Sequence, residues 1–294
     1  MSELQNSRLE ITEKTIDVEK VINNKNPKLL KWIPKFLVRK IKRIIHQDEI
    51  NEIIYTFRDD QPIEFATDVL HRFGVNVSSV GIENLEQANR FLVASNHPLG
   101  GLDGMALLSQ VGKKYPNVIF PVNDLLLFIP QFHGAFIPIN KHGSNASNTA
   151  IFNENFASEK PILYFPAGLC SRKQKKGVIK DLEWKKTFIS LAIKNKRDIV
   201  PTYIEGANSN FFYNLSRLRT KLKIKANIEM IYLPDEMFRQ KGAYIKIIFT
   251  KPVSYQFFDK SRKPIEWAHL MQEFVYTIKT GEEFFETFIL NKKQ

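Results

Sequence analysis

The residues best suited to chemistry lie in one short segment, Asn96 to Gly104, which reads NHPLGGLDG. His97 follows an apolar run, and Asp103 comes six positions later. A carboxylate that accepts a hydrogen bond from one imidazole nitrogen fixes the tautomer and leaves the other nitrogen as a general base. In acyl transfer such a base removes the proton of an attacking hydroxyl. We therefore predict base catalysis by His97 with Asp103; the alternative is that Asp103 only caps a helix and His97 bonds to backbone.

The elements that must position this pair are short β-rich runs alternating with helical stretches. Strands are expected at residues 91–95, 118–122, 135–139, 161–165, 198–204 and 243–249, and helices at 102–111, 144–156, 183–196 and 208–222. Near-continuous apolar strands separated by helices predict an α/β fold with a central, mostly parallel sheet flanked by helices. Ligands of such sheets bind at the carboxyl ends of strands, where His97 would lie.

Charge points to an anionic partner. The chain has a formal net charge of +12, from 43 Lys and Arg against 31 Asp and Glu. Residues 28–43 hold seven basic and no acidic side chains, and residues 170–225 hold fifteen basic and four acidic ones. Two basic stretches on an otherwise mildly acidic chain suggest phospholipid headgroups, a phosphorylated substrate, an acidic carrier protein or nucleic acid.

The first basic stretch predicts an amphipathic helix over residues 28–45. Apolar side chains such as Phe36 and Ile41 share one helical face, lysines lie on the other, and Trp32 lies at the edge. Pro34 either begins the main helix or kinks it. Such a helix suits the headgroup region of an anionic membrane, although an ordinary surface helix is the alternative. We therefore expect a helical membrane-associating segment at residues 1–74 and an α/β domain at residues 75–294.

Several classes of protein are excluded by composition and motifs. The single Cys170 leaves no internal disulfide and no cysteine-based zinc cluster, and the polar amino terminus is unlike a secretory signal, so a cytoplasmic location is expected. Residues 118–139 are long enough to span a membrane, but prolines interrupt them and we predict buried strands and turns. There is no G-x-S-x-G elbow, phosphate loop, H-E-x-x-H or dinucleotide fingerprint.

Four blocks over residues 91–210 resemble the glycerolipid and lysophospholipid acyltransferase superfamily. They are Asn96-His97 with Asp103, Gly134–Lys141 (GAFIPINK), Phe165–Gly168 followed by Ser171-Arg172, and Ile199–Pro201 followed by Gly206. The runs NHPLGGLDG, FPAG, DLEW and VPTYIEGANSNFF are specifically similar to the hemolysin and ornithine-lipid-type O-acyltransferase branch.

This resemblance implies an O-acyltransferase that moves a fatty acyl group from acyl-ACP or acyl-CoA to a hydroxyl of a lyso-aminolipid or a lysophospholipid. His97 would be the general base and Asp103 its orienting partner. Backbone N–H groups near Gly168, a glycine after a strand end, would stabilise the oxyanion. No metal or bound cofactor is implied, and the enzyme would be peripheral on the inner face of the cell membrane. Substrate-binding candidates are Asn96, Lys141, Ser171, Arg172 and Lys173.

The blocks also depart from the family pattern. Five residues separate His97 from Asp103 where four are usual, and we expect Gly100-Gly101 to absorb the extra residue in a tight turn. In the third block Ala167, Leu169 and Cys170 replace Glu, Thr and Arg, and Lys141 replaces an Arg of the second block. A site without a bidentate arginine should bind a carboxylate better than a phosphate monoester, which bidentate hydrogen bonds recognise.

Two other functions remain open from the sequence. A thioesterase or lipase would use the same histidine and aspartate with water as the acceptor. A non-catalytic module would use the basic stretches to bind a membrane or nucleic acid, but no nucleic-acid motif accompanies them, so nucleic acid is not an expected partner. His133 is a candidate to line the cleft, whereas Cys170, a lone cysteine near a basic segment, is not expected to act as a nucleophile.

Overall fold

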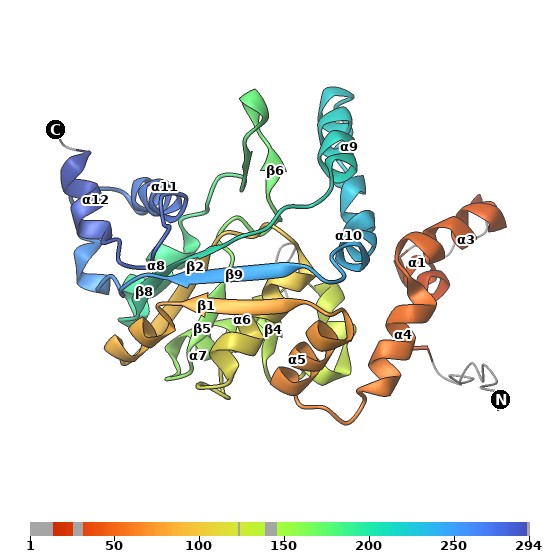
Figure 1. Ribbon diagram of the computed structural model, residues 1–294, viewed down its shortest axis with the longest axis horizontal. Coiled ribbons are helices and arrows are strands. Elements are labelled where there is room, and N and C mark those ends of the chain that lie inside the picture. Colours follow the sequence, from red (N-terminus) through yellow and green to blue (C-terminus); the bar gives the residue numbers. More distant parts are fainter. Residues whose placement is uncertain (1–13, 26–31, 123, 139–145, 293–294) are drawn as a thin grey trace.

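A five-stranded sheet lies at the centre of the computed structural model, which describes residues 14–25, 32–122, 124–138 and 146–292 (Figure 1). The strands are β1 (Asn76–Val80), β2 (Phe91–Ser95), β5 (Ile162–Tyr164), β8 (Asp198–Ile204) and β9 (Tyr244–Phe249). Their order is β1-β9-β8-β2-β5, with every neighbouring pair parallel except β8 and β9. The predicted mostly parallel sheet is confirmed, whereas β1 and the antiparallel pairing of β9 were not predicted.

Both faces of the sheet are buried, which explains why its strands read as apolar runs. In β2, Phe91 and Val93 belong to one core cluster, whereas Leu92 and Ala94 belong to the other. The first face is covered by α4 (Gln47–Thr56), α5 (Pro62–Arg72) and α6 (Gly101–Gly112). The second is covered by α7 (Ala146–Ala157), α8 (Thr187–Asn195), α11 (Pro264–Val275) and α12 (Phe285–Asn291). The sheet therefore lies between two helical layers, as expected.

Residues 118–122 and 124–138 form strands and turns beside the central sheet. β3 (Phe120–Val122) and β4 (Phe136–Pro138) make a separate parallel pair, with the 3-10 turns η2 (Asp124–Phe128) and η3 (Pro130–Phe132) between them. The prediction of strands and turns is confirmed, although these strands are not members of the main sheet. Among the helices that the structure describes, none has the length and apolar character needed to span a membrane.

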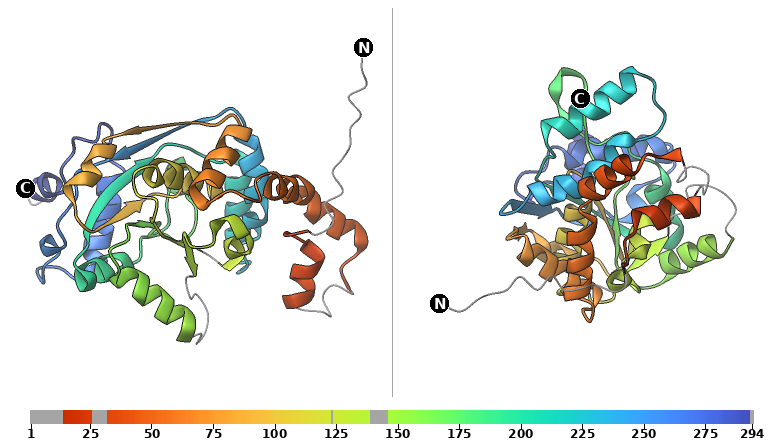
Figure 2. Two further views of the ribbon diagram at one scale, coloured as in Figure 1. Left: turned by 90° about the horizontal axis from the view of Figure 1, so that it is seen from below. Right: turned by 90° about the vertical axis from the view of Figure 1, so that its right-hand side faces the viewer.

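The N-terminal helices extend from one end of the molecule (Figures 1 and 2). α1 (Val18–Lys25) packs on α3 (Lys35–Ile44), which begins directly after Pro34, so this proline starts the helix. The segment is joined to the domain through His46, whose ring stacks on Phe238 at 3.9 Å. Ile53 of α4 and Phe65 of α5 enter the same core cluster as the strands, so helices before residue 74 help to build that core.

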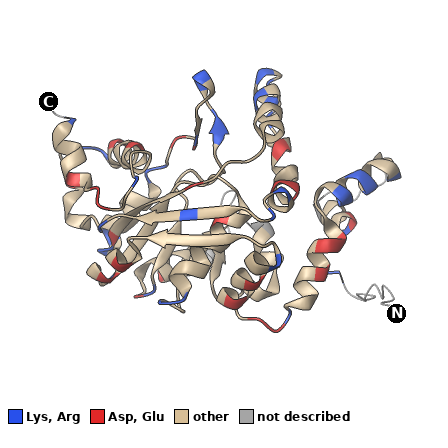
Figure 3. Ribbon diagram, in the orientation of Figure 1, with Lys and Arg blue, Asp and Glu red and all other residues tan. Residues whose placement is uncertain are grey.

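Two basic elements project beside each other from the opposite side of the sheet to α5 (Figures 1 and 3). One is an antiparallel hairpin of β6 (Arg172–Lys173) and β7 (Ile179–Lys180), with the turn η4 (Lys175–Gly177) at its tip. The other is α9 (Asn210–Lys221), followed by η5 (Ile228–Tyr232) and α10 (Leu233–Arg239). α9 was predicted and the hairpin was not. Two further 3-10 turns, η1 (Ile82–Gln87) and η6 (Tyr255–Phe257), complete the fold.

Candidate active site

His97 and Asp103 are hydrogen-bonded to each other at the carboxyl end of β2. Nδ1 of His97 lies 3.0 Å from Oδ1 and 3.1 Å from Oδ2 of Asp103. The Asp103 side chain is fully buried, and the His97 side chain is 17% exposed. An ionised carboxylate only accepts hydrogen bonds, so Nδ1 carries the proton and Nε2 is the basic nitrogen. Nε2 has no partner among the described residues, which leaves it available to a substrate hydroxyl.

The turn between the two residues absorbs the extra residue of this chain. Gly100 has φ +81° and ψ −120° immediately before α6, a conformation that glycine adopts without the strain of a side chain. Asp103 then lies in the first turn of α6, where the helix dipole favours a negative charge. Its Oδ2 also accepts the Leu99 N–H at 2.7 Å. The carboxylate is thus fixed on two sides, in the geometry that an orienting residue requires.

The end of β8 and the segment that follows it hold the loop of His97 from a second direction. The Asn96 amide is buried, donates to the Ile204 carbonyl at 2.8 Å and accepts the Ile204 N–H at 2.7 Å. Asn208 donates to the Pro98 carbonyl at 3.2 Å. A Cβ at Gly206 would lie 2.8 Å from the Leu99 side chain, so only glycine permits this close approach. The contacts give Asn96, expected to bind substrate, a role in joining the ends of β2 and β8.

The third block lies against the ring of His97. Phe165 stacks on the imidazole with centroids 4.0 Å apart and an interplanar angle of 18°. The turn continues to Gly168, whose N–H donates to the Phe165 carbonyl at 3.0 Å. That N–H is therefore already used, and an oxyanion donor in this turn must be a neighbour. The N–H groups of Ala167 and Leu169 donate to no described residue, so they are the available candidates.

Ser171 and Asp181 form a buried hydrogen-bond network behind His97. The Ser171 N–H donates to the His97 carbonyl at 2.7 Å, and its hydroxyl donates to Asp181 Oδ1 at 2.5 Å. The same carboxylate accepts the His97 N–H at 3.2 Å. Ser171, expected to bind substrate, is 2% exposed and connects the third block to the catalytic loop.

Asp181 is the site residue that the sequence did not reveal. Its Oδ2 accepts the Trp184 indole N–H at 2.9 Å, and its own N–H donates to the Tyr276 hydroxyl at 2.7 Å. Burial raises the pKa of the Asp181 carboxyl above its ordinary value of 3.8, and hydrogen bonds from Ser171 and Trp184 oppose that rise. The run DLEW, which begins with Asp181, was among the segments that resemble the family, but no role was predicted for this residue.

The basic candidates of the third block divide into two groups. Arg172 is buried, and its guanidinium pairs with Glu229 at 2.9 Å and lies over the Phe212 ring. Its charge is therefore already balanced by a buried carboxylate, and its role in substrate binding stays a prediction. Lys173 is only partly buried and forms no ion pair with a described residue, so it remains available. Lys141, expected to bind substrate, lies outside the described residues.

Cys170 is unsuited to nucleophilic catalysis. The thiol is fully buried, and burial raises its pKa to about 11, although the neighbouring Arg172 opposes the rise. A neutral, enclosed thiol is a poor nucleophile. His133 is exposed, and its Nε2 lies 3.3 Å from the Leu127 carbonyl oxygen rather than against the catalytic pair. No group of three or more potential metal ligands occurs within the described ranges.

Comparison with known proteins identifies the family to which this chain belongs. Two similar proteins are lyso-glycine lipid O-acyltransferases, from Bacteroides thetaiotaomicron (43% identical over 265 residues, 90% of this chain and 97% of that protein) and Phocaeicola vulgatus (42% over 265 residues, 90% and 95%). A solved structure, the 1-acyl-sn-glycerophosphate (LPA) acyltransferase PlsC of Thermotoga maritima, is 16% identical with a TM-score of 0.46 over 85% of both chains. The acyltransferase family matches residues 20–281. The chain therefore belongs to this acyltransferase family and is an enzyme that transfers acyl groups.

Proposed function

We propose that the enzyme transfers a fatty acyl group from a thioester to the hydroxyl of a lyso-glycine lipid. The observation that carries the proposal is the free Nε2 of His97, with Nδ1 held 3.0 Å from the buried Asp103 carboxylate. Similarity to two lyso-glycine lipid O-acyltransferases along nearly their whole length supports the same class of acceptor. This acceptor is an aminolipid, like the ornithine-type lipid expected from the sequence.

In this reaction His97 moves one proton twice. The acceptor oxygen attacks the thioester carbonyl carbon while Nε2 takes the hydroxyl proton, and Asp103 stabilises the imidazolium. N–H groups of the Ala167–Leu169 turn would bind the oxyanion of the tetrahedral intermediate. The C–S bond then breaks, and the imidazolium returns its proton to the sulfur. The products are an ester and the free thiol of the carrier.

Lys185 is suited to bind the headgroup of such an acceptor. Its ammonium lies 3.9 Å from the position that a Cβ on Gly168 would occupy, and its backbone N–H donates to the Pro166 carbonyl. Its side chain forms no ion pair with any residue in the described ranges. A single flexible ammonium is suited to bind a single carboxylate, whereas a phosphate monoester is bound better by a bidentate arginine. We therefore expect a glycine-type acceptor to be preferred over lysophosphatidic acid.

An anionic membrane surface would supply this lipid substrate. On α3 and just before it, Trp32 is 84% exposed and Phe36 65% exposed. The basic side chains Lys35, Arg39, Lys40 and Arg43 are exposed on the same segment. Exposed apolar rings beside cations favour the headgroup region of an anionic bilayer. This supports a peripheral enzyme on the inner face of the cell membrane.

The decisive experiment mixes the purified enzyme with a lyso-glycine lipid and a long-chain acyl thioester and measures both diacylated lipid and free fatty acid. Acylated lipid as the main product supports the transferase, whereas free fatty acid alone would identify a thioesterase. The His97→Ala variant should lose roughly 10²- to 10⁴-fold in rate while staying folded. His269→Ala is the matched control because that ring pairs with the exposed Glu183. Lysophosphatidic acid, assayed with the same donor, tests the choice of acceptor.

A further inference from the structure

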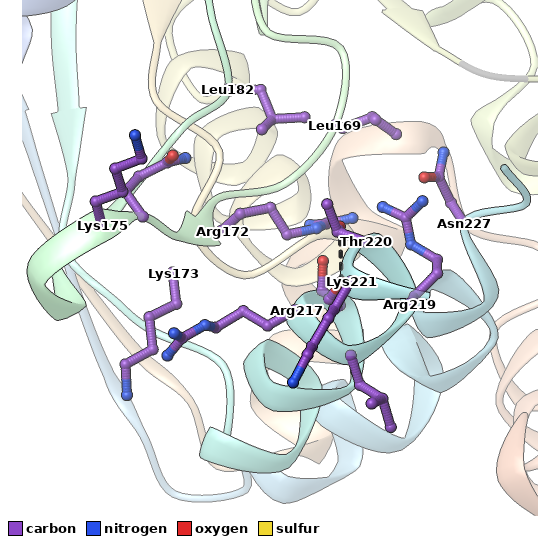
Figure 4. A pocket seen from close by; sticks show the side chains of 13 residues that line it. Leu169, Arg172, Lys173, Lys175, Leu182, Arg217, Arg219, Thr220, Lys221 and Asn227 are labelled. Carbon is purple, nitrogen blue, oxygen red and sulfur yellow. Dashed lines mark hydrogen bonds between the residues drawn. The ribbon is translucent and has the colours of Figure 1, made fainter. Parts of the chain in front are cut away.

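A basic pocket of about 570 Å³ opens between the β6–β7 hairpin and α9. Figure 4 shows its basic side chains coming from both elements, Lys173 and Lys175 from the hairpin side and Arg217, Arg219 and Lys221 from α9. Asn227, which follows α9, lines it as well. The pocket is thus built by the two projecting elements of the fold rather than by the sheet that carries His97.

The inner wall of this pocket adjoins the catalytic loop. Leu169, which lines it, directly follows Gly168 of the proposed oxyanion turn. Leu182, also in the wall, directly follows Asp181, whose carboxylate accepts the His97 N–H. A ligand in the pocket would therefore contact, at its inner wall, residues that directly follow Gly168 and Asp181 and, at its outer end, the cations.

The cations of the pocket form a fixed base and a free rim. At the base, Glu229 pairs with Arg172 at 2.9 Å and with Arg219 at 2.8 Å, so one buried carboxylate holds two guanidinium groups. At the rim, Lys173, Lys175, Arg217 and Lys221 form no ion pair with any residue of the described segments. Four unpaired cations around one concavity create a strongly positive potential that attracts an anion with several charges.

The two substrates of the proposed reaction differ in the charge that they carry. A glycine headgroup has a single carboxylate, which Lys185 alone can match. A fatty acyl thioester carrier joins its pantetheine arm to the rest of the carrier through phosphate, so its anionic end lies away from the reacting thioester. The pocket offers cations to that anionic end, whereas Leu169 and Leu182 in its wall directly follow Gly168 and Asp181.

We propose that the basic pocket binds the phosphate end of the pantetheine arm of the acyl donor. The inference rests on the proposed function and adds the donor to it. Coenzyme A and an acyl carrier protein share this phosphorylated arm. A nucleic acid fits less well, because no aromatic side chain lines the pocket to stack on bases. A flat membrane also fits less well, because the cations surround a concavity.

The test compares two double variants that each lose two positive charges. Arg217→Gln with Lys221→Gln neutralises exposed rim residues. Lys113→Gln with Lys194→Gln neutralises exposed lysines outside the pocket, one directly after α6 and one on α8. The rim variant should raise the donor KM roughly tenfold and leave the acceptor KM unchanged, and the effect should diminish at high salt. The control variant should leave both KM values unchanged.

Comparing two donors identifies which carrier supplies the phosphate, and a binding measurement without lipid makes the test independent of the acceptor. Palmitoyl-CoA and palmitoyl-ACP are compared as donors, and equilibrium binding of free CoA and of holo-ACP is measured without lipid. Weaker binding of either carrier to the rim variant supports the pocket, even if lyso-glycine lipid proves not to be the acceptor. Unchanged binding of both carriers, or a rise in the acceptor KM alone, would overturn it. Loss of vesicle binding with donor binding intact would also overturn it.

Discussion

The Ser171 N–H donates to the His97 carbonyl oxygen over 2.7 Å, so the third sequence block is bonded directly to the catalytic loop. The Ser171 hydroxyl and the His97 N–H meet again on one oxygen of Asp181. The backbone of the proposed general base is therefore held on both its donor and its acceptor side by a buried network. Such a network fixes the ring position before substrate binds, which reduces the reorganisation needed in the transition state.

Asp103→Asn should reduce turnover by roughly 10²- to 10⁴-fold without unfolding the enzyme. The asparagine oxygen can keep the bond to the Leu99 N–H, which leaves its NH₂ group facing Nδ1 of His97. That donor favours the tautomer with the proton on Nε2, so the base is blocked. Steady-state assays with both substrates in excess measure the loss, and circular dichroism checks the fold. Turnover near the wild-type value would show that another group orients His97.

Asp181→Asn should change both turnover and the pH dependence of stability. Burial raises the pKa of Asp181 in the folded chain above its ordinary 3.8, so the folded state binds the proton more tightly than the unfolded state does. Protonation of Asp181 therefore contributes to the free energy of unfolding below pH 3.8, and this contribution is lost as the pH rises through the raised pKa. Asparagine does not titrate. The difference between the unfolding free energies, wild type minus variant, should therefore fall as the pH rises.

Urea unfolding between pH 3.5 and 7 measures that difference, with the interval chosen as roughly the range around the ordinary carboxyl pKa. Turnover of the variant should fall roughly 10- to 100-fold, since small displacements of a catalytic group are costly. Asp198→Asn is the matched control for turnover, which it should leave unchanged. Burial also raises the pKa of Asp198, but its carboxylate accepts the Tyr255 N–H at the other end of β8. A stability difference that grows with pH would contradict the assignment for Asp181.

Lys185→Met should raise the KM for the lyso-glycine lipid and leave the donor KM and kcat close to wild type. Methionine keeps the length of the side chain and removes the ammonium that lies beside Gly168. We expect an increase of roughly tenfold, the typical consequence of losing one charge-assisted contact. The neighbouring Lys186→Met is the matched control, because that exposed lysine lies at the start of α8. Equal KM values in the two variants would exclude Lys185 from headgroup binding.

Cys170→Ala should retain activity within a few-fold of wild type. With a pKa of about 11, only about 1 in 1,000 thiols is ionised at pH 8, and the side chain is fully buried. The folded enzyme should therefore react slowly with a thiol reagent and rapidly once urea unfolds it. Fast labelling of the native protein, or inactivation by the alanine substitution, would give Cys170 a place in the chemistry.

The contrast between Asp103 and Asp181 shows how far the site could be predicted from the sequence. His97 and Asp103 are joined across one turn, and their spacing, the intervening glycines and the family resemblance together predicted the contact. Asp181 is bonded to His97 across 84 residues, through a hairpin whose strands have two residues each and no periodic pattern. The ion pair of Arg172 was missed for a similar reason, because its partner Glu229 lies 57 residues away. The orientation of β9 was also beyond prediction, since an apolar run does not encode direction.

Reversal of charge on α3 should release the enzyme from anionic vesicles. The change is Lys35→Glu with Arg39→Glu and Arg43→Glu, and it omits Lys42 because that lysine already pairs with Glu19 at 2.5 Å. Each basic residue near such a surface contributes about 1 kcal/mol, so three reversals should abolish sedimentation with phosphatidylglycerol vesicles at low salt.

A second variant separates the apolar contribution of the same segment from the electrostatic one. Phe36→Asp alters a ring that is 65% exposed and should weaken binding even to neutral phosphatidylcholine vesicles, where charge contributes little. Lys113→Glu with Lys194→Glu controls for net charge, because both lysines are exposed away from α3. Turnover on a monomeric, short-chain acceptor should stay intact in all these variants, since none touches His97. Sedimentation equal to wild type in both α3 variants would make this helix an ordinary surface element, and the enzyme would then have to reach its lipid by another face.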